Sequence, residues 1–141
     1  MSFAAGIIPY TKYNNELYFL LGLENGKWSG FVGGSELGEN PINTAIREFN
    51  EETAMIFEDL TLSFNKPPVV ELTSTGKTVY IWFINFPTPF FDISNFYLNQ
   101  SLINDSRFKE KSKLQWFSLN QVKNDRNKIL YRLKQTIIRK F

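Results

Sequence analysis

Three glutamates stand close together in the middle of the chain. Glu48, Glu51 and Glu52 occur at spacings i, i+3 and i+4, which places their carboxylates on one face if the segment is helical. Like charges at these spacings repel, and a divalent cation offsets that repulsion while leaving coordination positions for a phosphate. An exposed acidic face with Arg47 paired to Glu51 is the other explanation that these residues allow.

The composition narrows the chemistry of such a site. The chain contains neither cysteine nor histidine. Disulfides, thiolate catalysis and a histidine base are therefore excluded. Any metal site has to use oxygen ligands, which favours Mg²⁺ or Mn²⁺, and any proton acceptor is expected to be a carboxylate.

Residues 33–55 carry a longer pattern around these glutamates. The spacing is Gly-x5-Glu-x7-Arg-Glu-x2-Glu-Glu, with apolar Phe49 and Met55, and it is formed by Gly33, Glu39, Arg47, Glu48, Glu51 and Glu52. This segment resembles the Nudix box, the loop–helix–loop motif of the Nudix hydrolase family. The resemblance implies one domain over residues 1–141, an α+β fold that is an α/β/α sandwich with a central mixed β-sheet, and hydrolysis of phosphoanhydride bonds.

The resemblance also implies roles for individual residues. Glu48, Glu51 and Glu52 match the metal-binding glutamates of the family, and the carbonyl of Gly33 is expected as a further ligand. Arg47 matches the arginine that orients the glutamates, and Glu39 matches the first glutamate of the motif, which supports the site. With the cation bound, a carboxylate takes a proton from water, and the hydroxide attacks phosphorus in line.

Two positions depart from the family pattern. Ala54 stands where the family usually has a glycine, and it costs about 1 kcal/mol if that position needs a positive φ. Val32 replaces a first glycine before Gly33. Neither change removes an expected metal ligand.

A further carboxylate is expected in a later loop, since many family members have one there, followed by a tryptophan. Glu110 lies six residues before Trp116 and is the expected extra metal ligand or general base, with Asp105 as the alternative. The leaving phosphate is expected to meet one of three nearby cations, Lys109, Lys111 or Lys113.

Patterns along the chain predict the elements that hold these residues. Apolar runs predict strands over residues 3–8, 17–23, 69–73, 77–86 and 113–119, and Asn25-Gly26 predicts a hairpin turn. Asn40-Pro41 predicts a helix start, with an apolar stripe that includes Ile56. We expect a glycine-rich loop with short extended pieces over residues 28–38 and an amphipathic helix over residues 124–140. No clear pattern is visible over residues 87–108.

Substrate choice remains open at this point. Residues 107–141 hold eleven basic and two acidic residues, a net of +9, whereas residues 1–106 carry a net of −7. Three alternatives follow: hydrolysis of a small nucleoside diphosphate derivative, removal of the 5′ cap from RNA, and a non-catalytic Nudix-fold protein that binds nucleotide or RNA. A basic tail region is compatible with RNA, but a solvated helix face is the commoner explanation of such a pattern.

Aromatic residues are abundant, and four are expected to stack on a base: Trp28, Phe31, Tyr80 and Trp82. Core packing is the alternative for each of them. The N-terminus does not resemble a signal peptide, and no apolar stretch reaches the roughly 20 residues of a membrane helix. We therefore expect a cytoplasmic protein, in the host cytoplasm if the source is viral, with a homodimer possible.

Overall fold

Alternating apolar residues build a mixed sheet in the computed structural model of the protein, which describes residues 2–86 and 93–141. The strands are β1 (Phe3–Tyr13), β2 (Glu16–Glu24), β3 (Lys27–Ser29), β4 (Phe31–Gly34), β5 (Val69–Leu72), β6 (Thr78–Asn85) and β7 (Lys113–Ser118). The helices are α1 (Pro41–Glu52), α2 (Asn95–Leu102), α3 (Leu119–Lys123) and α4 (Tyr131–Lys140), with 3₁₀ turns η1 (Ser106–Lys109) and η2 (Asp125–Asn127).

The sheet runs in the order β3-β2-β1-β6-β5, with β4 also paired to β1 and β7 also paired to β2. Only the β1–β6 pair is parallel among the strand pairs that the structure describes. Strand β1 is therefore the centre of the sheet, and both β4, which leads into the loop before α1, and the start of β2 are paired with it.

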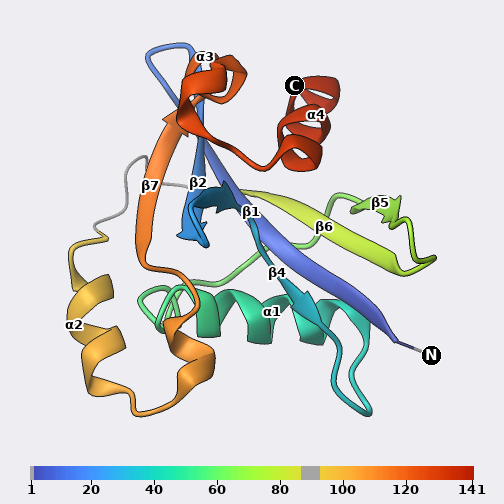
Figure 1. Cartoon of the computed structure of the whole chain (residues 1–141), viewed down its shortest axis with the longest axis vertical. Coiled ribbons are helices and arrows are strands. Elements are labelled where there is room, and N and C mark those ends of the chain that lie inside the picture. The colour runs from blue at the N-terminus through green and yellow to red at the C-terminus, as the bar shows by residue number, and fades with distance from the viewer. Residues whose placement is uncertain (1, 87–92) are drawn as a thin grey trace.

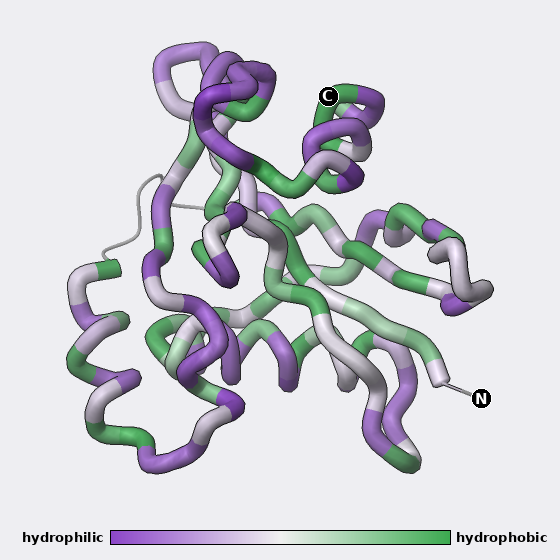
Figure 2. The backbone as a smooth tube through the Cα atoms, viewed as in Figure 1, coloured by the Kyte–Doolittle hydropathy of each residue, from purple (hydrophilic) through white to green (hydrophobic). Residues whose placement is uncertain are grey.

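Helices cover both faces of this sheet (Figure 1), because side chains alternate along each strand. Ala5 and Ile7 of β1 point into a core with Phe49 of α1. Ile8 points to the opposite side, into a second core with Val122 of α3 and Ile137 of α4. Hydrophobic residues accordingly gather along the central strands (Figure 2). The expected α/β/α sandwich around a mixed sheet is confirmed.

Two tight turns define the hairpins on either side of β2. Asn25 and Gly26 both have positive φ, of 51° and 78°, as a type I′ turn requires, which confirms the predicted hairpin. Asn14 and Asn15 form a second such turn, with φ of 49° and 61°. The sequence prediction missed this turn, and β1 consequently extends to Tyr13 rather than ending at Ile8.

The predicted C-terminal helix begins later than expected. It starts at Tyr131 rather than at residue 124. The chain at Lys128 is left-handed, and residues 128–130 pair with Trp28, whose N–H donates to the carbonyl of Lys128 at 3.0 Å and whose carbonyl accepts from the N–H of Leu130 at 2.8 Å. This long-range pairing uses backbone groups that a continuous helix would need.

Three other segments agree with the predictions to different degrees, or had no prediction. Residues 28–38 contain the short strands β3 and β4, and α1 ends at Glu52, before Ile56. In the segment 87–108, residues 87–92 lie outside the described residues, and the remainder forms α2 and η1. None of the helices within the described ranges is long and apolar enough to cross a bilayer.

Candidate metal and phosphate site

Local sequence explains where α1 begins and ends. The Oδ1 of Asn40 accepts a hydrogen bond from the N–H of Asn43 at 2.8 Å, and Pro41 occupies the first turn. At the other end the Thr53 hydroxyl donates to the carbonyl of Phe49 at 2.7 Å, and Ala54 and Met55 turn away with φ of 52° and 63°. All the expected metal-binding glutamates therefore lie on the last turns of this helix.

Arg47 connects these glutamates to the loop that precedes the helix. Its Nε lies 2.7 Å from the Oε2 of Glu39, and its Nη2 donates to the carbonyl of Gly34 at 2.8 Å. Its Nη1 lies 2.9 Å from Glu48 and 3.3 Å from Glu51. The guanidinium of Arg47 thus holds the carboxylates of Glu48 and Glu51 in place, while Glu39 in turn holds the guanidinium. This arrangement suits a residue that positions the glutamates.

This network changes the pKa of Glu39. Hydrogen bonds from Arg47 lower the pKa of the Glu39 carboxyl to about 2, and the N–H of Glu36 and the hydroxyl of Thr44 contribute in the same direction. The pKa of Arg47 is raised by the same contact with Glu39. Both groups are therefore charged over the whole physiological range.

Gly33 lies in direct contact with Glu48. A Cβ built on Gly33 would overlap the carboxylate of Glu48, whereas one on Gly34 would meet only the Nζ of Lys77 at 3.7 Å. Pairing of β4 with β1 places Gly33 opposite Ala5 and so brings its backbone beneath the helix. Glycine is required here because a carboxylate takes the space of a side chain.

A second group of carboxylates surrounds Glu52. Oxygens of Glu24, Glu52 and Glu110 all lie within 4.8 Å of one another, from the end of β2, the end of α1 and the segment before β7. Glu110 therefore lies where the sequence led us to expect a further carboxylate. Glu24 was missed, although its place at the end of an apolar strand, just before an Asn-Gly turn, is a pattern that would have indicated it.

The oxygens of Glu52 show that this cluster fits a hard cation. The side chain is 1% exposed, and its Oε2 has no hydrogen-bond partner among the described residues. Burial raises the pKa of Glu52 to about 9, a shift that the charge of Lys111 opposes and that Glu48 and Glu110 increase. Burial also raises the pKa of Glu51, and partial desolvation raises that of Glu110, which is otherwise exposed. A buried oxygen without a partner, among carboxylates that resist ionisation, suits Mg²⁺ or Mn²⁺ as the missing positive charge.

Lys111 is the basic residue inside this cluster. It is 2% exposed, and its Nζ lies 3.0 Å from the Oε1 of Glu24 and 3.4 Å from the Oε1 of Glu52. Lys109 and Lys113, which the sequence offered as alternatives, are exposed. Asp105, the alternative to Glu110, instead caps η1 and pairs with Arg107 at 2.7 Å.

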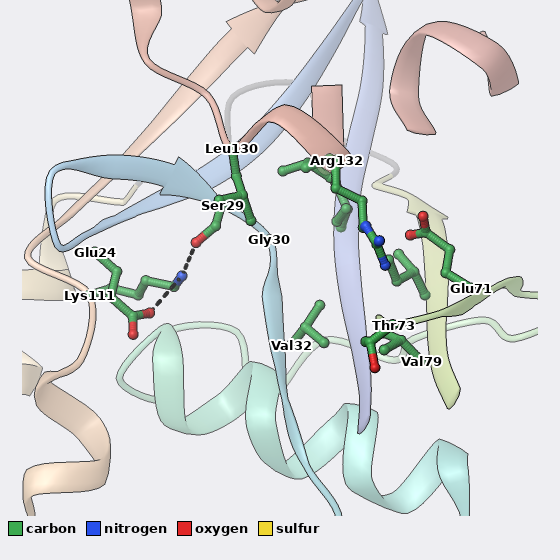
Figure 3. A pocket seen from close by; sticks show the side chains of 13 residues that line it. Glu24, Ser29, Gly30, Val32, Glu71, Thr73, Val79, Lys111, Leu130 and Arg132 are labelled. Carbon is green, nitrogen blue, oxygen red and sulfur yellow. Dashed lines mark hydrogen bonds and ion pairs between the residues drawn. The ribbon is translucent and has the colours of Figure 1, made fainter. Parts of the chain in front are cut away.

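A cavity of about 250 Å³ begins at this cluster and extends between the sheet and α4. Figure 3 shows Glu24, Lys111 and Ser29 at one end and Arg132, Glu71 and Thr73 at the other. The walls between them are mainly apolar, formed by Ile8, Val32, Val79, Ile81, Leu130 and Leu133. The carboxylate cluster and the cavity thus share Glu24 and Lys111.

The four aromatic residues expected at the substrate do not line this cavity. Phe31 has no exposed surface and packs edge-on against Phe49 at 5.5 Å, so its ring belongs to the core. Trp28 packs against Phe117 at 4.9 Å. Tyr80 and Trp82 lie together on β6 beside a different, shallow depression at the start of α1. Apolar spacing alone did not distinguish core rings from ligand-facing ones.

Comparison with known proteins gives a consistent result. The family model described as NUDIX domain matches residues 4–137. A C. elegans Ap4A hydrolase in a binary complex has a TM-score of 0.58 at 22% identity, over 98% of this chain and 99% of that one. RenU, a Nudix hydrolase of M. smegmatis, has a TM-score of 0.65 at 15% identity, over 97% of this chain and 84% of that one.

Two further relatives are informative. The NUDIX domain of Shewanella oneidensis NrtR, solved with ADP ribose, has a TM-score of 0.60 at 16% identity, covering 96% of this chain and 82% of that one. An uncharacterized protein of Acanthamoeba polyphaga mimivirus, L534, is 43% identical over 38% of this chain, and the match spans only 20% of the viral protein. The family match over residues 4–137 coincides with the observed fold and with the loop and helix that carry Gly33, Arg47 and the glutamates, and the chain therefore belongs to the Nudix hydrolase family.

Proposed function

We propose that this chain is a divalent-metal-dependent pyrophosphohydrolase that cleaves a diphosphate linkage in a nucleoside diphosphate derivative. The observation that carries the proposal is the carboxylate cluster around Glu52, which opens onto a mainly apolar cavity through Glu24 and Lys111. The carboxylates of the cluster would bind cations, which in turn would hold the phosphates, and the cavity suits an apolar, nucleoside-sized group. The solved structures of similar fold include an Ap4A hydrolase and a domain with bound ADP ribose, which supports nucleotide substrates of this kind.

The chain's own residues have separable tasks in this proposal. Glu48, Glu51, Glu52 and Glu110, with the carbonyl of Gly33, would hold Mg²⁺ or Mn²⁺, and Arg47 orients the first two. When bound, the cation neutralises the diphosphate and lowers the pKa of a coordinated water. Glu110 is our candidate to accept the proton of that water, because partial desolvation and the neighbouring carboxylate of Glu24 raise its pKa and make it a stronger base, while its side chain stays accessible to water.

The experiment is a substrate panel with metal and variant controls. Ap4A, ADP ribose, a nucleoside triphosphate and capped RNA are incubated with the protein in Mg²⁺, in Mn²⁺ or in EDTA, and the products are separated by chromatography. Glu52→Gln should lower kcat by at least about a hundredfold, because it removes one charge from the metal site. Glu58 is exposed and lies just beyond α1, so Glu58→Gln should leave kcat unchanged. Full turnover in EDTA, or in the Glu52 variant, would refute the metal mechanism.

Removal of the 5′ cap from RNA is the second candidate function, and one observation favours it. A polar groove of about 480 Å³ runs between β5 and α4 and shares Glu71 and Arg132 with the cavity beside the carboxylates. Arg139 also lines this groove. An RNA chain leaving the cavity along the groove would place a phosphate near Arg139, whereas a small nucleotide would end before it.

A further inference from the structure

Lys111 reaches the carboxylate cluster through the interior of the protein. A Cβ built on Gly22 of β2 would lie 2.7 Å from the Cδ and 2.9 Å from the Cγ of Lys111, so the absence of a side chain at Gly22 makes room for the lysine. The Nζ lies 5.9 Å from the centroid of the Phe31 ring, itself fully buried. The aliphatic stem is therefore confined, and the ammonium has little freedom to leave its position.

The ammonium has a complete set of partners in that position. It donates to the Oγ of Ser29 at 2.5 Å, and it lies 3.0 Å from Glu24 and 3.4 Å from Glu52. An ammonium group has three donors and no acceptor, so these three oxygens satisfy it. Glu24 and Glu52 are two of the three carboxylates that approach one another closely enough to share a metal ion.

One lysine does not neutralise this cluster. Lys111 contacts two carboxylates, Glu24 and Glu52, while Glu48 and Glu110 add further negative charge near Glu52. The Oε2 of Glu52 has no hydrogen-bond partner among the residues that the structure describes. Lys111 contacts the other oxygen, Oε1. The two oxygens of Glu52 therefore differ: one is taken by a cation of the protein itself, and one remains for a cation from solution.

We propose that the Lys111 ammonium takes the place of one divalent cation between Glu24 and Glu52, so that the chain binds one fewer divalent ion than its carboxylates would otherwise hold. The remaining ion is held on the side of Glu48 and the free oxygen of Glu52. This inference rests on the metal site of the proposed function but not on its substrate. It makes Lys111 a positioning residue that sets the number of bound ions.

The first test counts bound metal. Mn²⁺ is titrated into the metal-free protein, and free Mn²⁺ is measured by electron paramagnetic resonance, for the wild type, Lys111→Met and Lys123→Met. Lys123 is exposed at the end of α3, at the opposite end of β7 from Lys111 (Figure 1), so its variant matches the change in net charge without touching the cluster. Lys111→Met should bind one more Mn²⁺ per chain than the other two proteins. Equal stoichiometry in all three would overturn the proposal.

Thermal unfolding keeps the test valid if the variant is unstable. Without metal, Lys111→Met should unfold at a lower temperature than the wild type, because Glu24 and Glu52 lose their partner. Mn²⁺ should raise its Tm more than that of the wild type, since ligand bound only to the folded state stabilises it. An equal Mn²⁺ effect on both proteins would contradict the inference.

A third measurement needs no variant. Anomalous diffraction from wild-type crystals soaked in Mn²⁺ should show no manganese between Glu24 and Glu52, with Lys111 still in place. A manganese peak there, with the lysine displaced, would refute the proposal. None of these experiments depends on turnover, so the proposed hydrolysis can fail on every substrate while the count of bound ions still decides this inference.

Discussion

At the scale of single residues, Ala54 shows how a departure from the family pattern is accommodated. Its φ of 52° confirms that the position is left-handed, a conformation that costs a residue with a Cβ about 1 kcal/mol. Two contacts support it: its N–H donates to the carbonyl of Glu51 at 3.3 Å, and its own carbonyl accepts from the Nδ2 of Asn99 at 3.0 Å. Its methyl group is fully buried, which offsets part of the strain.

Gly33 and Gly34 provide a matched pair for testing the contact with Glu48. Gly33→Ala should displace the Glu48 carboxylate and lower both Mn²⁺ affinity and kcat by at least about tenfold, because small shifts of reacting groups are costly. Gly34→Ala should stay close to the wild type, since its Cβ would meet only the end of Lys77. The measurements are Mn²⁺ titration and initial rates. Equal losses in both variants would contradict the specific role of Gly33.

Residue types predicted the site better than they predicted its surroundings. Glu48, Glu51 and Glu52 could be named as candidates because their spacing matches the family motif, and Glu110 because many family members have a carboxylate in the corresponding loop. The ring of Phe31 belongs to the core rather than to a ligand site, and the sequence could not show this, because an aromatic ring in an apolar run is equally suited to both. Lys111 was one of three candidate lysines, with Lys109 and Lys113, and only the fold shows which of the three is buried.

At the scale of elements, the segment 34–40 and α1 behave as one unit joined by Arg47. The folded-state pKa of Glu39, about 2, lies below its ordinary value of 4.5. A lowered pKa contributes stability that is present above about pH 4.5 and is lost as the pH falls towards 2. The link between loop and helix should therefore weaken in acid.

Glu39→Gln isolates this contribution. The Tm of the wild type should exceed that of the variant at pH 6, and the difference should shrink between pH 4.5 and pH 2, since protonated Glu39 no longer pairs with Arg47. Glu58→Gln serves as the control, because its side chain is exposed and forms no ion pair with another described residue. A difference for Glu39→Gln that stays constant over this pH range would argue against the ion pair.

Local patterns predicted the elements where local interactions decide them. Asn40-Pro41 and the Asn25-Gly26 turn were identified because capping and positive φ are properties of a few adjacent residues. The start of α4 was not, because the backbone of residues 128–130 pairs with Trp28, about a hundred positions earlier in the chain. The spacing of apolar residues within 124–140 gives no indication of that contact.

At the scale of the whole molecule, the basic C-terminal region divides into parts with different surroundings. The ammonium of Lys134 pairs with Asp125, and Arg132 lines the cavity beside the carboxylate cluster. Lys111 is buried in the cluster itself. The net charge of this region, prominent in the sequence, is therefore not a single surface: Lys111 is buried and Lys134 is half-buried, whereas the other basic side chains are exposed and lie on different elements.

Arg139 separates the small-nucleotide and RNA substrates. If capped RNA follows the groove between β5 and α4, Arg139→Gln should weaken its binding and reduce the salt slope by about one unit. Arg126→Gln is the matched control, because Arg126 is exposed but does not line the groove. Turnover of Ap4A should not change in either variant. Identical RNA binding by wild type and Arg139→Gln at every salt concentration would favour the small substrate.

The three carboxylates of the cluster, Glu24, Glu52 and Glu110, come from distant parts of the chain, and this has a consequence for folding order. Arg47, Glu39 and Glu48 lie within ten residues, so their contacts form as soon as α1 and its preceding loop are in place. Glu24 and Glu110 meet only after β7 has paired with β2. A chain with α1 formed but β7 detached would lack Glu110, one of the proposed metal ligands, and Lys111, which pairs with both Glu24 and Glu52. Bound metal therefore stabilises the late, fully paired sheet over any partly folded form, and cation affinity reports whether the last strand has docked.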